Sequence, residues 1–270
     1  MSTVDADGIT ISYTDDGSGE PLVLVHGHPF DRSMWRPQIQ RFSGSGWRVV
    51  APDLRGYGET TVVPGTTALE RFARDIAGLL DRIGVDSCVL GGLSMGGQIV
   101  MEFYRLFPTR VRGLLLADTF AAAETEAGKR ARNEMADRLL VEGMTPYAEE
   151  VLAKMVSAAN IRQLPEVAEH VLVMMRNAPP EGAAAALRGR AERPDYTSML
   201  PSVSVPTLVV VGADDEFTPV ADAEFIHQCI PHSTLVVIEG AAHMPNLERP
   251  QQFNAAVERF LTALPASSRA

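Results

Sequence analysis

A serine between glycines, an acidic cluster and a histidine follow one another along the chain, and together they could perform nucleophilic catalysis. Ser94 lies in Gly92-Leu-Ser-Met-Gly96, a G-x-S-x-G pattern between an apolar run and an amphipathic one. In a strand–turn–helix setting this pattern is typical of an exposed nucleophile at the carboxyl end of a sheet. Two alternatives are a glycine turn with a helix-capping serine and a phosphate loop. The second lacks the Gly-Lys-Ser/Thr that phosphate binding needs.

A serine hydroxyl is a weak nucleophile, so Ser94 needs a base and an acid that orients the base. Of the six histidines, His243 follows an apolar run whose end should reach the same edge of the sheet. The acid candidates after the preceding apolar run are Asp214, Asp215 and Glu216, each of which could instead cap a helix. Asp118, at the end of another apolar run, is the rival acid.

An oxyanion hole requires two N–H donors that point at the same place. The residue after the nucleophile supplies one, here Met95, and a loop after an early strand supplies the other. In His26-Gly-His-Pro29 we assign it to the N–H of His28. The side chains of His26 and His28 lie two residues apart without a third ligand, so the sequence predicts no metal site and no cofactor.

Short runs rich in Val, Leu and Ile alternate with amphipathic stretches, as in a doubly wound, mostly parallel α/β sheet. The predicted strands are Ile9–Tyr13, Leu22–Val25, Arg48–Ala51, Ser87–Leu90, Gly113–Ala117, Thr207–Val211 and Leu235–Ile238. The predicted helices between them are Met34–Phe42, Leu69–Ile83, Met95–Phe107, Val220–Cys229 and Gln251–Leu261.

The region 120–193, called the cap segment below, has no strand pattern and repeats helical periods instead. We therefore predict a helical cap inserted between two core strands, with residues 1–119 and 194–270 as the core. The cap segment is rich in methionine and largely apolar, which favours a hydrophobic acyl or alcohol portion in the substrate. The tail Pro265–Ala270 is expected to fray.

The composition excludes several classes of partner. The chain has 270 residues with 24 Lys and Arg against 34 Asp and Glu, a net charge of −10, which argues against nucleic acid and anionic membranes. No run is long enough to span a bilayer, and the first residues lack the apolar core of a secretory signal. Two cysteines cannot form a disulfide framework, so a cytoplasmic location is expected. The oligomeric state stays open.

Five segments of the chain, in order, match the landmarks of the α/β-hydrolase family, which the chain resembles over nearly its whole length. They are His26-Gly-His-Pro29, Asp53-Leu-Arg-Gly-Tyr-Gly58, Gly92-Leu-Ser-Met-Gly96, Gly212-Ala-Asp-Asp-Glu-Phe-Thr-Pro219 and Ala242-His-Met-Pro-Asn-Leu-Glu-Arg-Pro250. The resemblance implies that the acid is Asp215, in D-x-x-T-P, that the base is His243, and that a helical cap covers the site. It is strongest to the bacterial branch with 3-oxoadipate enol-lactonases, small carboxylesterases and cofactor-free haloperoxidases.

The residues and the resemblance together predict a serine hydrolase that cleaves a small carboxylic ester or lactone through an acyl-enzyme on Ser94. Epoxide hydrolases and dehalogenases of the family use a carboxylate nucleophile, which the serine at position 94 excludes. The alternatives are a C–C bond hydrolase, a perhydrolase or haloperoxidase-like activity on the same triad, and a ligand-binding receptor of this fold with slow turnover.

Overall fold

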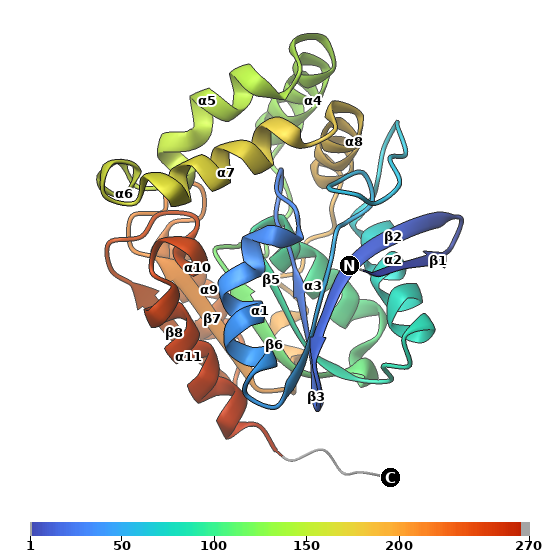
Figure 1. The fold of residues 1–270 in the computed structure, drawn as a ribbon, viewed down its shortest axis with the longest axis vertical. Helices are drawn as coiled ribbons and strands as arrows, with labels where there is room; N and C mark the ends of the chain where they lie inside the picture. The colour runs from blue at the N-terminus through green and yellow to red at the C-terminus, as the bar shows by residue number, and fades with distance from the viewer. Residues whose placement is uncertain (1, 266–270) are drawn as a thin grey trace.

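The computed structural model describes residues 2–265, and its centre is one eight-stranded sheet (Figure 1). The strands are β1 (Ser2–Ala6), β2 (Ile9–Gly17), β3 (Glu20–Val25), β4 (Trp47–Pro52), β5 (Cys88–Leu93), β6 (Val111–Ala117), β7 (Thr207–Gly212) and β8 (Ser233–Ile238). Their order in the sheet is β1-β2-β4-β3-β5-β6-β7-β8. The β1–β2 and β2–β4 pairs are antiparallel, and every other pair is parallel. The predicted fold class is confirmed.

All seven predicted strands are present, but the sequence analysis missed β1. This edge strand alternates between partly buried and exposed positions, with only Ala6 buried, and carries few apolar residues. Its hairpin partner is β2, and the turn between them is Asp7-Gly8, where both residues have positive φ. Asp-Gly is a favoured pair for a two-residue hairpin turn. The turn was therefore the signal for β1, and the hydrophobic pattern was not.

Helices cover both faces of the sheet. Those of the core are α1 (Arg36–Ser43), α2 (Leu69–Arg82), α3 (Met95–Leu106), α9 (Val220–Cys229), α10 (Pro245–Glu248) and α11 (Pro250–Ala263). Short 3-10 turns occupy Arg32–Trp35, Pro108–Arg110 and Leu200–Ser202. The buried residues of α2, α3 and α9 belong to one apolar cluster, and those of α1 and α11 belong to a second. The two clusters lie on opposite faces, as a doubly wound sheet requires.

The cap segment, all of which the structure describes, contains helices and no strand. These are α4 (Glu126–Glu142), α5 (Met144–Met155), α6 (Ala158–Gln163), α7 (Pro165–Asn177) and α8 (Pro180–Ala191). They follow β6, precede β7, and lie together beyond one end of the sheet (Figure 1). The division into a core and a cap domain stays a prediction. Within residues 2–265 no helix is both long and apolar enough to cross a bilayer. Most of the tail predicted to fray lies outside the described residues.

The parallel strands β3, β5, β6, β7 and β8 are neighbours in the sheet, so their carboxyl ends meet at one edge. The predicted oxyanion loop follows β3, Ser94 follows β5, and Asp118 follows β6. Asp215 follows β7, and His243 follows β8. Residues as far apart in the sequence as His28 and His243 are thereby brought to the same edge, next to the cap segment.

Candidate active site

Ser94 lies at a sharp turn between β5 and α3. Its φ of 58° and ψ of −119° are strained for a residue with a side chain. A Cβ on Gly92 would lie 2.3 Å from the carbonyl oxygen of Gly96, and one on Gly96 would lie 2.2 Å from the carbonyl oxygen of Val25. Both distances are far below van der Waals contact. The two glycines of G-x-S-x-G are therefore required by close backbone packing around the serine.

His243 and Asp215 form a buried pair in which Nδ1 of the imidazole is 2.8 Å from Oδ2 of the carboxylate. Asp215 also accepts hydrogen bonds from the N–H of Phe217 at 2.8 Å and from the N–H and hydroxyl of Thr218. Burial alone would raise the pKa of Asp215, but His243 and the bonds from Thr218 outweigh it and lower that pKa. The carboxylate is thus held ionised beside the ring.

Ser94 and His243 line the same cavity, which has a volume of about 110 Å³. Within residues 2–265 the hydroxyl of Ser94 makes no hydrogen bond, and the residue is 8% exposed. The ring of Phe217 packs edge-on against the imidazole with 5.2 Å between centroids. In enzymes without substrate the nucleophile–base bond is often long, so proximity in one cavity is the relevant observation.

Asp118, the rival acid, lies beside Asp215. It is 1% exposed, has a φ of 44°, and accepts the N–H of Gly212 at 2.9 Å through Oδ1. Its Oδ2 has no donor within the described residues. Burial and the charge of Asp215 raise the pKa of Asp118 well above its usual range. The raised pKa favours the protonated carboxyl, in which Oδ2 can act as a donor.

Ligand atoms of Asp118, Asp215 and His243 lie within 4.8 Å of one another, the spacing of a possible cation site. The imidazole nitrogen and the Asp215 oxygen are already at hydrogen-bond distance. The raised pKa of Asp118 favours its protonated form. The arrangement fits the hydrogen-bonded pair of the predicted triad, and a cation would have to displace the proton shared by His243 and Asp215.

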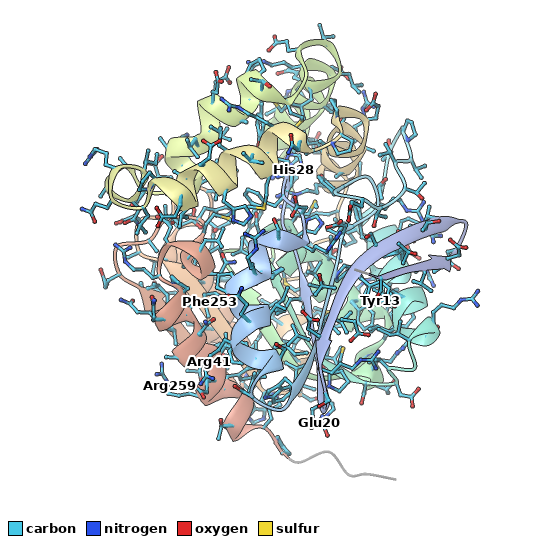
Figure 2. The ribbon with its side chains drawn as sticks, viewed as in Figure 1. Tyr13, Glu20, His28, Arg41, Phe253 and Arg259 are labelled. Carbon is cyan, nitrogen blue, oxygen red and sulfur yellow. The ribbon has the colours of Figure 1, made fainter. Side chains whose placement is uncertain are left out.

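The predicted oxyanion donors lie on two sides of Ser94. Met95 is the first residue of α3, whose N–H has no acceptor within its own helix. His28 is in the loop after β3 and reaches the cavity from the top of the core, beneath the cap segment (Figure 2). Its Nδ1 is 2.7 Å from the hydroxyl of Tyr57. Burial, and then the charges of Arg190 and Arg132, lower the pKa of His28 well below its usual range, so this ring is neutral.

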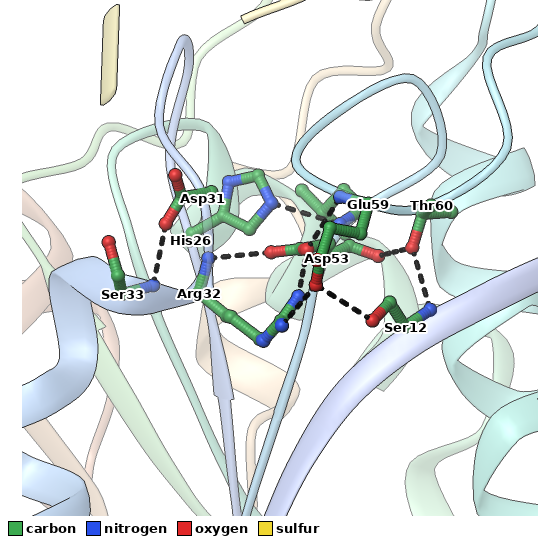
Figure 3. Close-up of polar contacts among 9 residues, drawn as sticks. Ser12, His26, Asp31, Arg32, Ser33, Asp53, Glu59 and Thr60 are labelled. Atoms are coloured by element: carbon green, nitrogen blue, oxygen red, sulfur yellow. Dashed lines mark hydrogen bonds and ion pairs between the residues drawn. The ribbon is translucent and has the colours of Figure 1, made fainter. Parts of the chain in front are cut away.

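The oxyanion loop is fixed by the segment after β4 (Figure 3). Nε2 of His26 accepts the N–H of Leu54 at 2.9 Å, while its Nδ1 donates to the carbonyl of Gly27 at 2.8 Å. Asp53 accepts the N–H groups of Arg32 at 2.8 Å and Glu59 at 2.9 Å, and pairs with the guanidinium of Arg32. Both ring nitrogens of His26 are thus used by the backbone. Its role is to hold the loop in place.

The cavity has two walls of different character. We call the core wall the lining residues His28, Ser94, Phe217, Thr218 and His243, and the cap wall the lining residues Phe120, Arg132, Tyr147, Met155, Leu187 and Arg190. The sequence analysis expected an apolar cap, whereas two guanidinium groups lie in the cap wall. The sequence pattern indicated the position of these two arginines only weakly. Arg190 is four residues after the buried Ala186 and so shares its helix face, whereas Arg188, two residues earlier, is half-buried and pairs with Asp137.

Residues 20–250 match the family model described as the alpha/beta hydrolase fold. The match covers most of the chain, and the nucleophile turn, the strand order and the His–Asp pair agree with it. The chain belongs to the α/β-hydrolase family.

Individual relatives support a hydrolase. A 3-oxoadipate enol-lactonase of Acinetobacter baylyi is 31% identical over 261 residues, covering 96% of each chain. A thermophilic esterase from Thermogutta terrifontis, solved with malate bound, superposes with a TM-score of 0.93 at 42% identity over 96% of each chain. The enol-lactonase from Burkholderia xenovorans gives a TM-score of 0.90 at 27% identity, over 97% of this chain and all of the other.

Proposed function

We propose that this protein is a serine hydrolase that cleaves a small carboxylic ester or lactone through an acyl-enzyme on Ser94. The observation that carries the proposal is the buried His243–Asp215 hydrogen bond of 2.8 Å, with the imidazole lining the same cavity as the serine. Esterase and lactonase relatives agree with this chemistry.

In the first half-reaction the oxygen of Ser94 attacks the substrate carbonyl while Nε2 of His243 takes the hydroxyl proton. Asp215 holds Nδ1–H of the ring, which fixes the tautomer and stabilises the imidazolium. The N–H groups of His28 and Met95 bind the oxyanion of the tetrahedral intermediate. The intermediate then collapses, and the imidazolium gives its proton to the leaving alkoxide.

In the second half-reaction His243 takes a proton from a water molecule, whose oxygen attacks the ester of Ser94. Collapse of the second intermediate releases the carboxylic acid and returns the proton to the serine. One water is consumed for each ester bond. In a lactone the alcohol and the acid leave as one molecule. Loss of one oxyanion donor costs about 100- to 1000-fold in kcat in comparable enzymes.

The test is Ser94→Ala, assayed with p-nitrophenyl acetate and with δ-valerolactone. We expect kcat to fall about 10⁴- to 10⁶-fold, because the nucleophile is lost while the fold is kept. Ser202→Ala is the control, since Ser202 is exposed and bonds only to the carbonyl of Met199 within the described residues. A fluorophosphonate probe should label the parent and the control once per chain. Equal turnover by Ser94→Ala and the parent would exclude the proposal.

A further inference from the structure

Arg190 on α8 is a buried cation with which no carboxylate among the described residues pairs. It is 7% exposed, and its one hydrogen bond within residues 2–265 runs from Nε to Oε1 of Gln98, at 3.1 Å. Both terminal nitrogens of the guanidinium are left without an acceptor, although the residue lines the cavity. Burying an unpaired charge is costly. A buried cation without a partner therefore indicates a binding position for an anion.

The charges around Arg190 do not supply that anion. Arg132 and Arg193 both pair with the same carboxylate, Glu124. These two guanidinium groups therefore share one acid, and no carboxylate within the described residues pairs with Arg190. The groups that influence Arg190 electrostatically are Arg132, Arg193 and two tyrosines, and none is a carboxylate. Burial first, and then Arg132 and Arg193, lower the pKa of Arg190 well below its usual range.

Arg190 is placed close to the nucleophile and held there. Gln98 lies one helical turn after Ser94, and its N–H donates to the carbonyl of Ser94 at 3.2 Å. Helix α8 packs directly on the core, since a Cβ on Gly189 would lie 1.7 Å from the carbonyl oxygen of Thr67. The N–H of Thr67 also donates to the carbonyl of Ala185 at 2.9 Å. The guanidinium is thus presented on a rigid element.

We infer that Arg190, with Arg132 beside it in the cap wall, binds a carboxylate carried by the substrate, so that the enzyme selects anionic small esters or lactones. This rests on the proposed serine hydrolase function. A carboxylate is planar and accepts two parallel N–H bonds from one guanidinium. Bound there, it supplies the missing counter-ion and sits near the carbonyl that Ser94 attacks. The overall charge of −10 does not oppose this, because the field inside the cavity is set by the nearby arginines.

The experiment compares two methyl esters of similar shape, monomethyl succinate, which carries a carboxylate at neutral pH, and methyl levulinate, which is neutral. We expect the parent to favour monomethyl succinate in kcat/KM. In Arg190→Met the ratio of the two kcat/KM values should fall about 10- to 100-fold, the usual weight of a charge-assisted hydrogen bond. Arg188→Met is the matched control, because Arg188 lies on the same helix, half-buried and outside the cavity lining, and pairs with Asp137. It should leave the ratio as in the parent.

A purely structural role for Arg190 gives a different result. In that case Arg190→Met lowers the melting temperature and reduces turnover of both esters equally, and the inference is wrong. If Arg190 is a substrate-binding cation, removing an unpaired buried charge should keep or raise the melting temperature. Arg190→Lys should recover part of the ratio, since it restores the charge without the planar fork.

Binding without turnover separates this inference from the proposed function. Ser94→Ala protein, titrated calorimetrically with succinate, should bind it, and the double variant Ser94→Ala/Arg190→Met should not. If the parent hydrolyses neither ester while succinate still binds through Arg190, the proposed function fails and the anion site stands. If esters are cleaved but succinate binding is absent, or orthophosphate binds in its place, the carboxylate site is excluded and the hydrolase stands.

Discussion

The core wall and the cap wall of the cavity handle charge in opposite ways. Behind the core wall the carboxylate of Asp215 is satisfied, since it accepts hydrogen bonds from His243, Phe217 and Thr218, which line that wall. In the cap wall no acid among the described residues pairs with Arg190, whose one hydrogen bond goes to Gln98. Catalytic groups whose hydrogen bonds are already satisfied can act on any substrate carbonyl placed next to Ser94. A cation without a counter-ion instead favours substrates that carry an anion. The comparison suggests that the core wall supplies the reaction and the cap wall supplies the selection.

A substitution in the core wall, or at the carboxylate that supports His243, should affect all substrates alike. Asp215→Asn should have the largest effect after loss of Ser94. The amide favours the wrong tautomer of His243, so we expect kcat to fall about 10⁴-fold for the neutral and the anionic ester. The measurement is steady-state turnover of both methyl esters. An active Asp215→Asn together with an inactive Asp118→Asn would show that Asp118 is the catalytic acid.

Two Gly→Ala substitutions, each of which adds one methyl group, compare the two walls. In Gly96→Ala the new Cβ would collide with the carbonyl of Val25 and displace the nucleophile turn. A displacement of about 1 Å can cost about 100-fold, and we expect that loss in kcat for both esters. In Gly189→Ala the helix that carries Arg190 must shift from Thr67. There we expect about a tenfold loss confined to the anionic ester.

Gly44→Ala is the control for this pair. Gly44 has a negative φ, and its nearest neighbour to an added Cβ is 3.9 Å away, so the methyl group fits. Turnover of both esters should match the parent. If Gly96→Ala and Gly189→Ala change the ratio of the two kcat/KM values equally, the proposed difference in role between the two walls is wrong.

The same division explains how far the sequence could predict the site. The positions of Ser94, Asp215 and His243 follow from local patterns at strand ends, and parallel strands must bring those ends to one edge. The position of Arg190 depends on which face of α8 meets the core, and Arg188 two residues earlier offers an equal charge. Tertiary packing decides which of the two arginines faces the cavity, and a single sequence does not show that packing.

Asp118 is an intermediate case. The sequence analysis identified it as a rival acid at the end of a strand, which is where it lies. Its place beside Asp215 depends on the alignment of β6 with β7, in which Ala117 pairs with Val210. The resulting bond from the N–H of Gly212 fixes the Asp118 carboxyl in the interior. Register between strands is a property of the sheet, and hydrophobic runs do not set it to within one residue.

The smallest effect we predict is on stability, and it tests whether Asp118 holds a proton. Its pKa is raised in the folded protein, so the unfolded chain ionises at about pH 4 while the folded one stays neutral. The unfolded state then binds fewer protons, and stability falls as pH rises from about 4 toward the folded pKa. Asp118→Asn removes this loss and keeps both an acceptor for Gly212 and a donor toward Asp215. Denaturant unfolding of both proteins between pH 4 and 8 measures the difference.

The variant should match the parent in stability near pH 4 and exceed it progressively above, by about 1.4 kcal/mol for each unit by which the pKa is raised. Asp215 has its pKa lowered, so its contribution is lost only as pH falls, and it is common to both proteins. Asp118→Ala is the control. It leaves the N–H of Gly212 without an acceptor and should lower the free energy of unfolding by about 1–3 kcal/mol at every pH. If the parent is more stable than Asp118→Asn at pH 8, Asp118 is ionised, and an unsatisfied charge lies beside Asp215, behind the core wall.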